Sequence, residues 1–230
     1  MPPLSPLLLP PSKLRAALNQ FKSWGALSWG SLVEHFLFAA PTTVGRAAHH
    51  RAAQSGLYAL EEEFISQGWA GAETGFSKLA PDQAKPLTPS QFFGSHFDFA
   101  QRKPRRPLSG LYLPDGHDNG NIPFCAQSPE VQPSLFGGYA YALLEPPGGL
   151  IRPDFWWRKK RSPLPEETGP AFTRLCDALF GDLETLEIYQ WPTDCSNHFN
   201  EDRKIWGNFF WTVHAPSKNW FVTILSDDLD

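Results

Sequence analysis

The chain has few groups that could cross-link it or give it a strong net charge. It contains only three cysteines, Cys125, Cys176 and Cys195, and an odd number in a chain of this length argues against a disulfide-bonded secreted scaffold. Charged residues make up 19% of the chain, and 20 Lys and Arg against 24 Asp and Glu leave a net charge of −4. This balance excludes a strongly basic protein that binds nucleic acid through its overall charge.

Long apolar runs and targeting segments are also lacking. The leucines at 7–9 are preceded by no Lys or Arg and are interrupted on both sides by prolines, which is not the pattern of a signal peptide. No stretch of about 18 residues is free of charge and proline, so we expect no transmembrane helix. We therefore expect a soluble, cytoplasmic protein without a membrane partner.

Short catalytic motifs are missing as well. The sequence contains no Walker A loop, no dinucleotide-binding glycine pattern, no G-x-S-x-G and no H-E-x-x-H. We therefore expect no cofactor, no bound metal and no catalytic residue of these types. What is abundant is aromatic surface: 14% of the residues are Phe, Trp or Tyr, including 9 Trp and 18 Phe. That is enough for a large core and for contacts with a partner.

The first third of the chain has helical periodicity. Apolar residues recur at helical spacing after Ser12, again over 31–40, and again over 44–67. Prolines and glycines then dominate 71–108, where the only helical pattern covers 90–97. The sequence therefore predicts a helical lobe over 1–70 and a connecting region over 71–108.

The remaining residues, 109–230, contain mainly strand patterns. Short apolar runs at 109–113, 138–144 and 185–191 favour strands, and the pattern at 166–180 favours a helix. Two aromatic runs at 209–214 and 220–225, joined by five residues, predict an antiparallel hairpin. We therefore predict an α+β fold: N-terminal helices packed with a mainly antiparallel sheet that includes this hairpin. The 109–230 lobe and the rest could also form one compact domain.

Two polar clusters could carry out chemistry. The loop at 115–121 contains Asp115, His117 and Asp118, and Cys195 precedes His198 by three residues. Together they would suit a small hydrolase or a metal-dependent enzyme. The loop also has the composition of an ordinary turn, and a lone cysteine is also a small apolar core residue. Both interpretations stay open at this stage.

Other charged and titratable groups have ordinary interpretations beside functional ones. His49 and His50 point about 100° apart on a predicted helix, so we expect them at the surface or partly buried rather than on one metal ion. Basic clusters at 102–106 and 158–161 would suit a nucleic-acid-binding adaptor, although they sit in an acidic surrounding and we do not expect direct nucleic-acid binding. The acidic run at Glu61, Glu62 and Glu63 would complement a basic partner.

The C-terminal stretch carries a resemblance. Its pattern is formed by Trp206, Gly207, Phe210, Trp211, Thr212, Val213, Trp220, Phe221, Val222 and Ile224, followed by Asp227 and Asp228. It resembles the tails of immunity proteins encoded beside bacterial polymorphic or type VI secretion toxins, in which an aromatic strand pair precedes an acidic turn. The resemblance covers about the last 25 residues.

The resemblance implies a protein that is not an enzyme and that neutralises a toxic effector. Its partner would be a cognate protein toxin, such as a nuclease with a basic active-site cleft, which it would occlude. The acidic residues that would make the contact are Glu61, Glu62, Glu63, Asp115, Asp118, Asp227 and Asp228. The enzyme built on the 115–121 loop with Cys195 and His198 is the alternative.

Overall fold

The protein has an α+β fold, in agreement with the sequence analysis. The computed structural model describes residues 4–7, 12–23, 33–66, 79–94, 97–104, 138–144, 165–196, 199 and 209–226. Its helices and strands are α1 (Ser12–Ser23), β1 (Val33–Ala39), α2 (Arg46–Ser66), η1 (Pro81–Gln83), β2 (Lys85–Leu87), α3 (Pro89–Phe93), β3 (Phe97–Asp98), β4 (Lys103–Pro104), α5 (Gly138–Leu144), α6 (Pro165–Leu179), β5 (Glu187–Gln190), η3 (Thr193–Cys195), β6 (Phe209–Ala215), η4 (Pro216–Lys218) and β7 (Trp220–Ser226).

A five-stranded antiparallel sheet forms the centre of the molecule. Its strand order is β1-β7-β6-β5-β2, so the predicted C-terminal hairpin β6–β7 is confirmed and lies in the middle. The turn between the two strands ends at Asn219, which adopts the left-handed conformation. Every residue of β6 is buried. Because side chains alternate across a strand, both faces of the sheet must therefore be covered.

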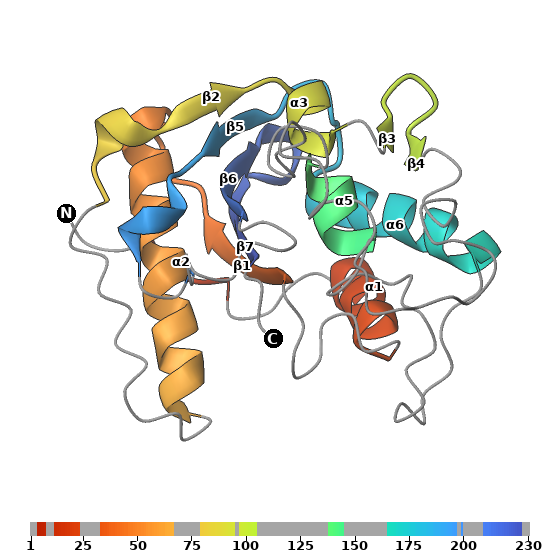
Figure 1. Cartoon of the computed structure of the whole chain (residues 1–230), viewed down its shortest axis with the longest axis horizontal. Coiled ribbons are helices and arrows are strands. Elements are labelled where there is room, and N and C mark those ends of the chain that lie inside the picture. Colours follow the sequence, from red (N-terminus) through yellow and green to blue (C-terminus); the bar gives the residue numbers. More distant parts are fainter. Residues whose placement is uncertain are drawn as a thin grey trace, which may run out of the picture.

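Helices cover both faces of this sheet (Figure 1). Helix α2 packs against β7, β6 and β1 on one face, whereas α1, α3, α5 and α6 lie on the other side. Side chains alternate between the two faces along β6: Trp211 and Val213 join the core beneath α6, and Phe210 joins the core on the α2 face.

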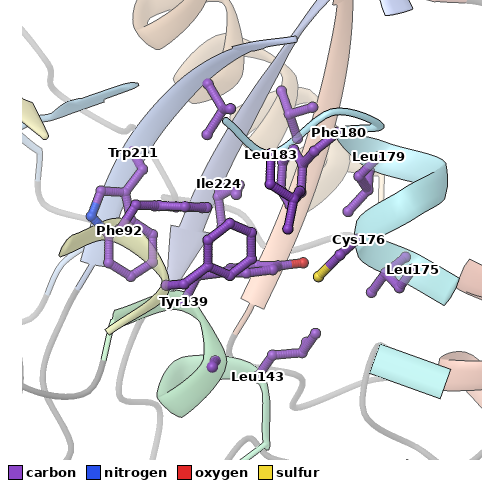
Figure 2. Close-up of a cluster of buried hydrophobic side chains, with 14 of the residues drawn as sticks. Phe92, Tyr139, Leu143, Leu175, Cys176, Leu179, Phe180, Leu183, Trp211 and Ile224 are labelled. Carbon is purple, nitrogen blue, oxygen red and sulfur yellow. The ribbon is translucent and has the colours of Figure 1, made fainter. Parts of the chain in front are cut away.

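Aromatic rings fill the core on the α6 side (Figure 2). Phe92 stacks on Tyr139 at a centroid distance of 5.2 Å and meets Trp211 edge-on at 5.5 Å. The Nε1–H of the buried Trp220 donates to the Leu179 carbonyl at 2.8 Å, at the end of α6. Buried aromatic pairs of this kind add about 0.5–1.5 kcal/mol each beyond the area they bury.

Both edges of the sheet carry a proline. Residues 4–7 run along β1, where Ala39 N–H donates to Ser5 O and Leu7 N–H donates to Leu37 O. Pro6 lies in this segment, and Pro86 lies in the opposite edge strand, β2. A proline has no N–H to offer a further strand, so these residues protect the edges from pairing with another chain.

The helix predicted over 31–40 is wrong, because this segment contains the strand β1. Val33, Phe36 and Leu37 have helical spacing in the sequence, but β1 pairs with β7 along its whole length. Leu37 packs into the core on one face of the sheet and Phe36 into the cores on the other. A strand with apolar residues on both faces loses the simple alternation that identifies a strand.

The strand predicted over 138–144 is also wrong, because these residues form helix α5. Tyr139, Ala140 and Leu143 are all buried, so the short helix is enclosed by the core. The helix predicted at 90–97 is shorter, because α3 ends at Phe93 before Gly94, whose φ is 76°. The described part of the 71–108 region also contributes β2 to the main sheet.

The other predicted elements within the described residues are present. The first helix is α1, the 44–67 helix is α2, the 166–180 helix is α6, and the 185–191 strand is β5. Gly181 follows α6 with a φ of 67°, and its N–H donates to the Asp177 carbonyl as a helix-ending glycine does. The run at 109–113 lies outside the described residues.

Helix α2 approaches the sheet closely at Gly56. A Cβ at this position would overlap the side chain of Thr223 on β7. By contrast, a Cβ on Gly169 in α6 would meet no atom within 4 Å. The fold therefore requires a glycine at position 56, where α2 packs on β7, but not at position 169.

We expect Gly56→Ala to lower the free energy of unfolding by about 1–2 kcal/mol, because the clash with Thr223 outweighs the better helix propensity of alanine. The control Gly169→Ala should change it by no more than about 0.5 kcal/mol, because the gain in helix propensity is offset by Pro170, which disfavours the helical conformation for a preceding residue with a Cβ. Urea unfolding followed by circular dichroism measures both values. A Gly56→Ala variant that is no less stable than Gly169→Ala would contradict the close packing of α2 on β7.

Candidate functional site

Helix α2 has an inner face of mostly small residues. Its buried residues are Ala48, His49, Ala52, Ala53, Ser55, Gly56, Leu57 and Leu60. Small side chains bring the helix backbone close to the strands, as the Gly56 contact shows. The Oγ1–H of Thr223 on β7 donates directly to the α2 backbone, at Ala52 O, over 2.9 Å. Polar contacts therefore join this helix to the sheet beside apolar ones.

A buried polar cluster lies beneath the N-terminal half of α2. His49 Nδ1 lies 2.9 Å from Thr212 Oγ1 on β6, and the Nε1–H of Trp191 donates to the same oxygen at 2.9 Å. The three groups come from α2, β6 and the segment after β5. Each of them is buried. Because a buried polar group without a partner is costly, this shared hydroxyl fixes the helix on the sheet.

His49 is fully buried, which differs from the partly exposed state expected from the sequence. Its ring lies between Tyr189, at a centroid distance of 4.6 Å, and Phe221, at 4.8 Å. Burial, with a smaller contribution from the nearby His214, lowers the pKa of His49 to about 3. Among the described residues, His49 Nε2 has no hydrogen-bond partner. The imidazole is therefore held neutral.

His214 on β6 lies on the same face of the sheet. Its ring is 5.0 Å from Phe221, and its Nδ1 is 3.6 Å from Glu187 Oε1 on β5, which is too long for a good hydrogen bond. Within the described residues we find no group of three or more His, Cys, Asp and Glu side chains that could hold a metal ion. The histidines are thus packing groups in this arrangement.

The outer face of α2 has the opposite character. Among the described residues, the large apolar side chains that are exposed are Tyr58, at 48%, and Ile65, at 63%. They are seven residues apart, so they lie on one side of the helix. Glu61 and Glu62 fall between them on that side, and Glu62 and Glu63 are exposed while Glu61 is half-buried. We call Tyr58, Glu61, Glu62 and Ile65 the outer face of α2; Glu63 is also exposed but points about 140° away from Tyr58 around the helix axis.

The other predicted contact residues cannot be placed beside this face. Asp115, Asp118, Asp227 and Asp228 lie outside the described residues, as do His117 and His198. The structure therefore places three of the seven predicted contact residues, and it places them together on one helix. Tyr58 and Ile65 were not predicted as contact residues, because apolar residues on a helix are usually core residues. Their spacing opposite the alanines of α2 is the signal that could have identified them.

Cys195 has the properties of a core residue rather than of a nucleophile. It is 2% exposed and packs with Trp191 and Phe210. Burial raises the pKa of its thiol to about 12, with a further contribution from the Asp194 carboxylate. Since the thiolate is the reactive form, this environment opposes nucleophilic catalysis.

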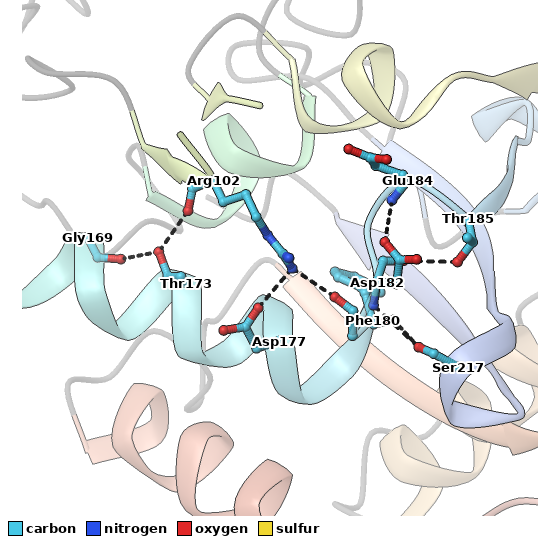
Figure 3. A network of polar contacts seen from close by, with 10 residues as sticks. Arg102, Gly169, Thr173, Asp177, Phe180, Asp182, Glu184, Thr185 and Ser217 are labelled. Atoms are coloured by element: carbon cyan, nitrogen blue, oxygen red, sulfur yellow. Dashed lines mark hydrogen bonds and ion pairs between the residues drawn. The ribbon is translucent and has the colours of Figure 1, made fainter. Parts of the chain in front are cut away.

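Arg102, from the first basic cluster, is occupied within the fold (Figure 3). Its Nη2 donates to Asp177 Oδ1 at 3.1 Å and to Gly181 O at 2.9 Å, and its own carbonyl accepts from Thr173 Oγ1. An arginine at the carbonyl end of a helix satisfies unpaired acceptors and complements the helix dipole. Arg102 therefore ties β3–β4 to α6; Arg105, Arg106 and the 158–161 cluster lie outside the described residues.

Comparisons with known proteins give no match: no family model, no curated protein and no solved structure matches the chain. In the part of the chain that the structure describes, no helix combines the length and apolar character needed to cross a membrane. Function must therefore be argued from the geometry of the chain itself.

We expect Thr212→Val to lower the free energy of unfolding by about 2–4 kcal/mol. Valine has the shape of threonine but leaves both Trp191 Nε1–H and His49 Nδ1 without their buried partner. The control Thr185→Val removes an exposed hydrogen bond to Asp182 and should change stability by about 0.5 kcal/mol or less. Equal effects in chemical unfolding would show that the cluster does not hold α2.

Stability should fall in mild acid. Burial lowers the pKa of His35, beneath α5, to about 4, and that of His49 to about 3, against 6.5 in the unfolded chain. The unfolded chain therefore binds more protons as the pH falls below 6.5. Between pH 7.5 and pH 5 we expect a loss of about 4 kcal/mol, or about 2 for each histidine. Urea unfolding across this range would contradict the prediction if stability stayed constant.

Proposed function

We propose that the chain is a cytoplasmic immunity protein that binds a cognate toxin and occludes its active site. The observation that carries the proposal is the outer face of α2, where exposed Tyr58 and Ile65 flank an acidic run. The resemblance of the C-terminal stretch to immunity proteins of secreted toxins supports it. The partner's matching surface would be basic with an apolar recess.

The chemistry of this face suits a tight protein contact. Tyrosine is among the residues that contribute most to protein interfaces, since its ring buries a large area and its hydroxyl can still form a hydrogen bond. Ile65 adds apolar area two turns further along the same side of the helix. Tyr58 and Ile65 would supply affinity, and the glutamates around them would exclude partners without positive charge.

The acidic run suits an enzyme that acts on a polyanion. A nuclease holds its substrate in a basic cleft, and carboxylates on a rigid helix can occupy the phosphate positions. Opposite charges also speed the encounter of the two proteins at low ionic strength. A toxin with nuclease activity is therefore the partner class that the outer face of α2 fits best.

Co-expression tests the proposed function directly. The chain would be expressed with the product of each neighbouring open reading frame, and growth and co-purification would be measured. We expect one neighbour to be toxic alone, harmless with this chain, and recovered in a stable complex with it. If no neighbouring product is toxic or bound, the immunity function is wrong.

We expect the triple variant Glu61→Lys, Glu62→Lys, Glu63→Lys to weaken toxin binding about tenfold or more, because it places like charges on both partners. Tyr58→Ala should weaken it about 30-fold, which is the effect of losing an interface anchor of about 2 kcal/mol. Calorimetric titration measures both affinities, and thermal melting checks that the fold is intact.

The matched control is Glu184→Lys, which changes the net charge by the same amount as the single variant Glu62→Lys and is compared with it; Glu184 is an exposed acidic residue in the turn between α6 and β5 (Figure 3). It should leave the affinity within about twofold of the unchanged protein, because it lies away from α2. If the control weakens binding as much as the α2 variants do, the effect comes from net charge and the outer face of α2 is not the contact.

A further inference from the structure

We propose that His49 acts as an acid-sensitive latch that holds the N-terminal half of α2 on the sheet. Its ring is fully buried and contacts Tyr189 and Phe221, and its Nδ1 lies on Thr212 Oγ1. In the part of the chain that the structure describes, its Nε2 has no hydrogen-bond partner. The proposal concerns the folded chain alone and does not depend on the proposed function.

The groups around His49 offer little to stabilise a positive charge. Among the described residues, the carboxylate–imidazole pair on this face is Glu187 with His214, at 3.6 Å, and it does not include His49. His214 would itself repel a protonated His49. The titratable or charged residues that lie in the N-terminal half of α2, or on its side of the sheet, are Arg46, His50 and Arg51 on α2, Glu34 on β1, Glu187 and Tyr189 on β5, and His214 on β6. The carboxylates of α2 itself, Glu61, Glu62 and Glu63, lie at least three turns further along the helix, and His35 of β1 lies on the opposite face of the sheet.

The positions of the basic neighbours add to this effect. The Arg46 guanidinium lies 5.9 Å from the centre of the Tyr189 ring, which also contacts His49. His50 Nε2 is engaged with Leu79 O at 3.0 Å. A protonated His49 would be a buried charge with the Arg46 cation on the same Tyr189 ring, and its Nε2–H would have no acceptor among the described residues, which is strongly unfavourable.

Protonation would be relieved by moving α2, because the ring of His49 contacts Tyr189, Thr212 and Phe221 of the sheet. The apolar residues that attach this half of the helix are Ala48, Ala52 and Ala53, which bury little area. Two further bonds hold it: Thr223 Oγ1–H to Ala52 O, and Leu4 N–H to Ser55 Oγ. A form with this half of α2 released is therefore the one that acid favours.

The size of the effect follows from proton linkage. In the released form the imidazole would titrate near its ordinary pKa of 6.5, whereas in the closed form the pKa is about 3. Lowering the pH from 7.5 to 5 should then raise the population of the released form about 30-fold. The population of the globally unfolded chain should rise more steeply over the same pH range, because global unfolding also exposes His35.

Hydrogen exchange with mass spectrometry tests the latch at pH 7.5 and pH 5, with correction for the intrinsic exchange rate. Amides of 46–56 report on α2, and amides of 209–226 report on the central hairpin. In the unchanged chain we expect α2 to exchange faster than the hairpin at both pH values, with an opening constant that rises about 30-fold in acid.

Two variants separate the latch from general acid unfolding. His49→Gln should abolish the acid response of α2, because glutamine does not titrate. His35→Gln is the matched control, because this histidine lies on the opposite face of the sheet, 3.0 Å from the Tyr139 hydroxyl. In this variant the opening constant of α2 should still rise about 30-fold in acid, and only the acid response of the hairpin should become smaller.

The proposal is overturned if α2 and the hairpin exchange at the same rate and respond to acid together, or if the α2 response survives His49→Gln. If His49→Gln fails to fold, the exchange of α2 and of the hairpin in the unchanged chain and in His35→Gln still tests the proposal. A response of α2 that falls with His35→Gln would show global unfolding alone.

Discussion

The burial of the β6–β7 hairpin on both faces is the constraint on which the rest of the structure depends. All seven residues of β6 are buried, so neither face of the central strands tolerates water. One layer of helices would leave half of these side chains exposed, and each Å² of apolar surface left in water costs roughly 25 cal/mol of stability. The chain therefore supplies α2 for one face and α1, α3, α5 and α6 for the other (Figure 1).

The sequence was informative where local pattern and tertiary role agree. The hairpin, α2 and α6 could be predicted because each has clear periodicity and a recognisable end, such as Gly181 after α6. β1 and α5 could not, because both are short and apolar on more than one side. For such runs, only pairing with a distant segment decides the structure, and β1 is defined by β7, nearly 190 residues later in the chain.

The candidate site was predictable in the same partial way. Glu61, Glu62 and Glu63 could be placed on a helix from the sequence, and the structure has them there. The burial of His49 could not be foreseen, because its partner Thr212 lies 163 residues away on another element. Nor could Tyr58 and Ile65 be separated from core residues before the face that contacts the sheet was known. Local sequence determines which element carries a side chain, and long-range packing determines which way it faces.

The two faces of α2 are linked by the close approach that Gly56 permits. A helix packed this near to β7 cannot use large apolar side chains along its first half, so its position depends on directional bonds to Thr212 and Thr223. Such bonds fix the rotation of the helix about its own axis more strictly than apolar contacts do, because they need particular atoms within about 3 Å. That rotation decides which residues face outward. The polar cluster inside therefore sets the direction in which Tyr58, Glu62 and Ile65 are presented, and a change in the charge of His49 would act on both faces at once.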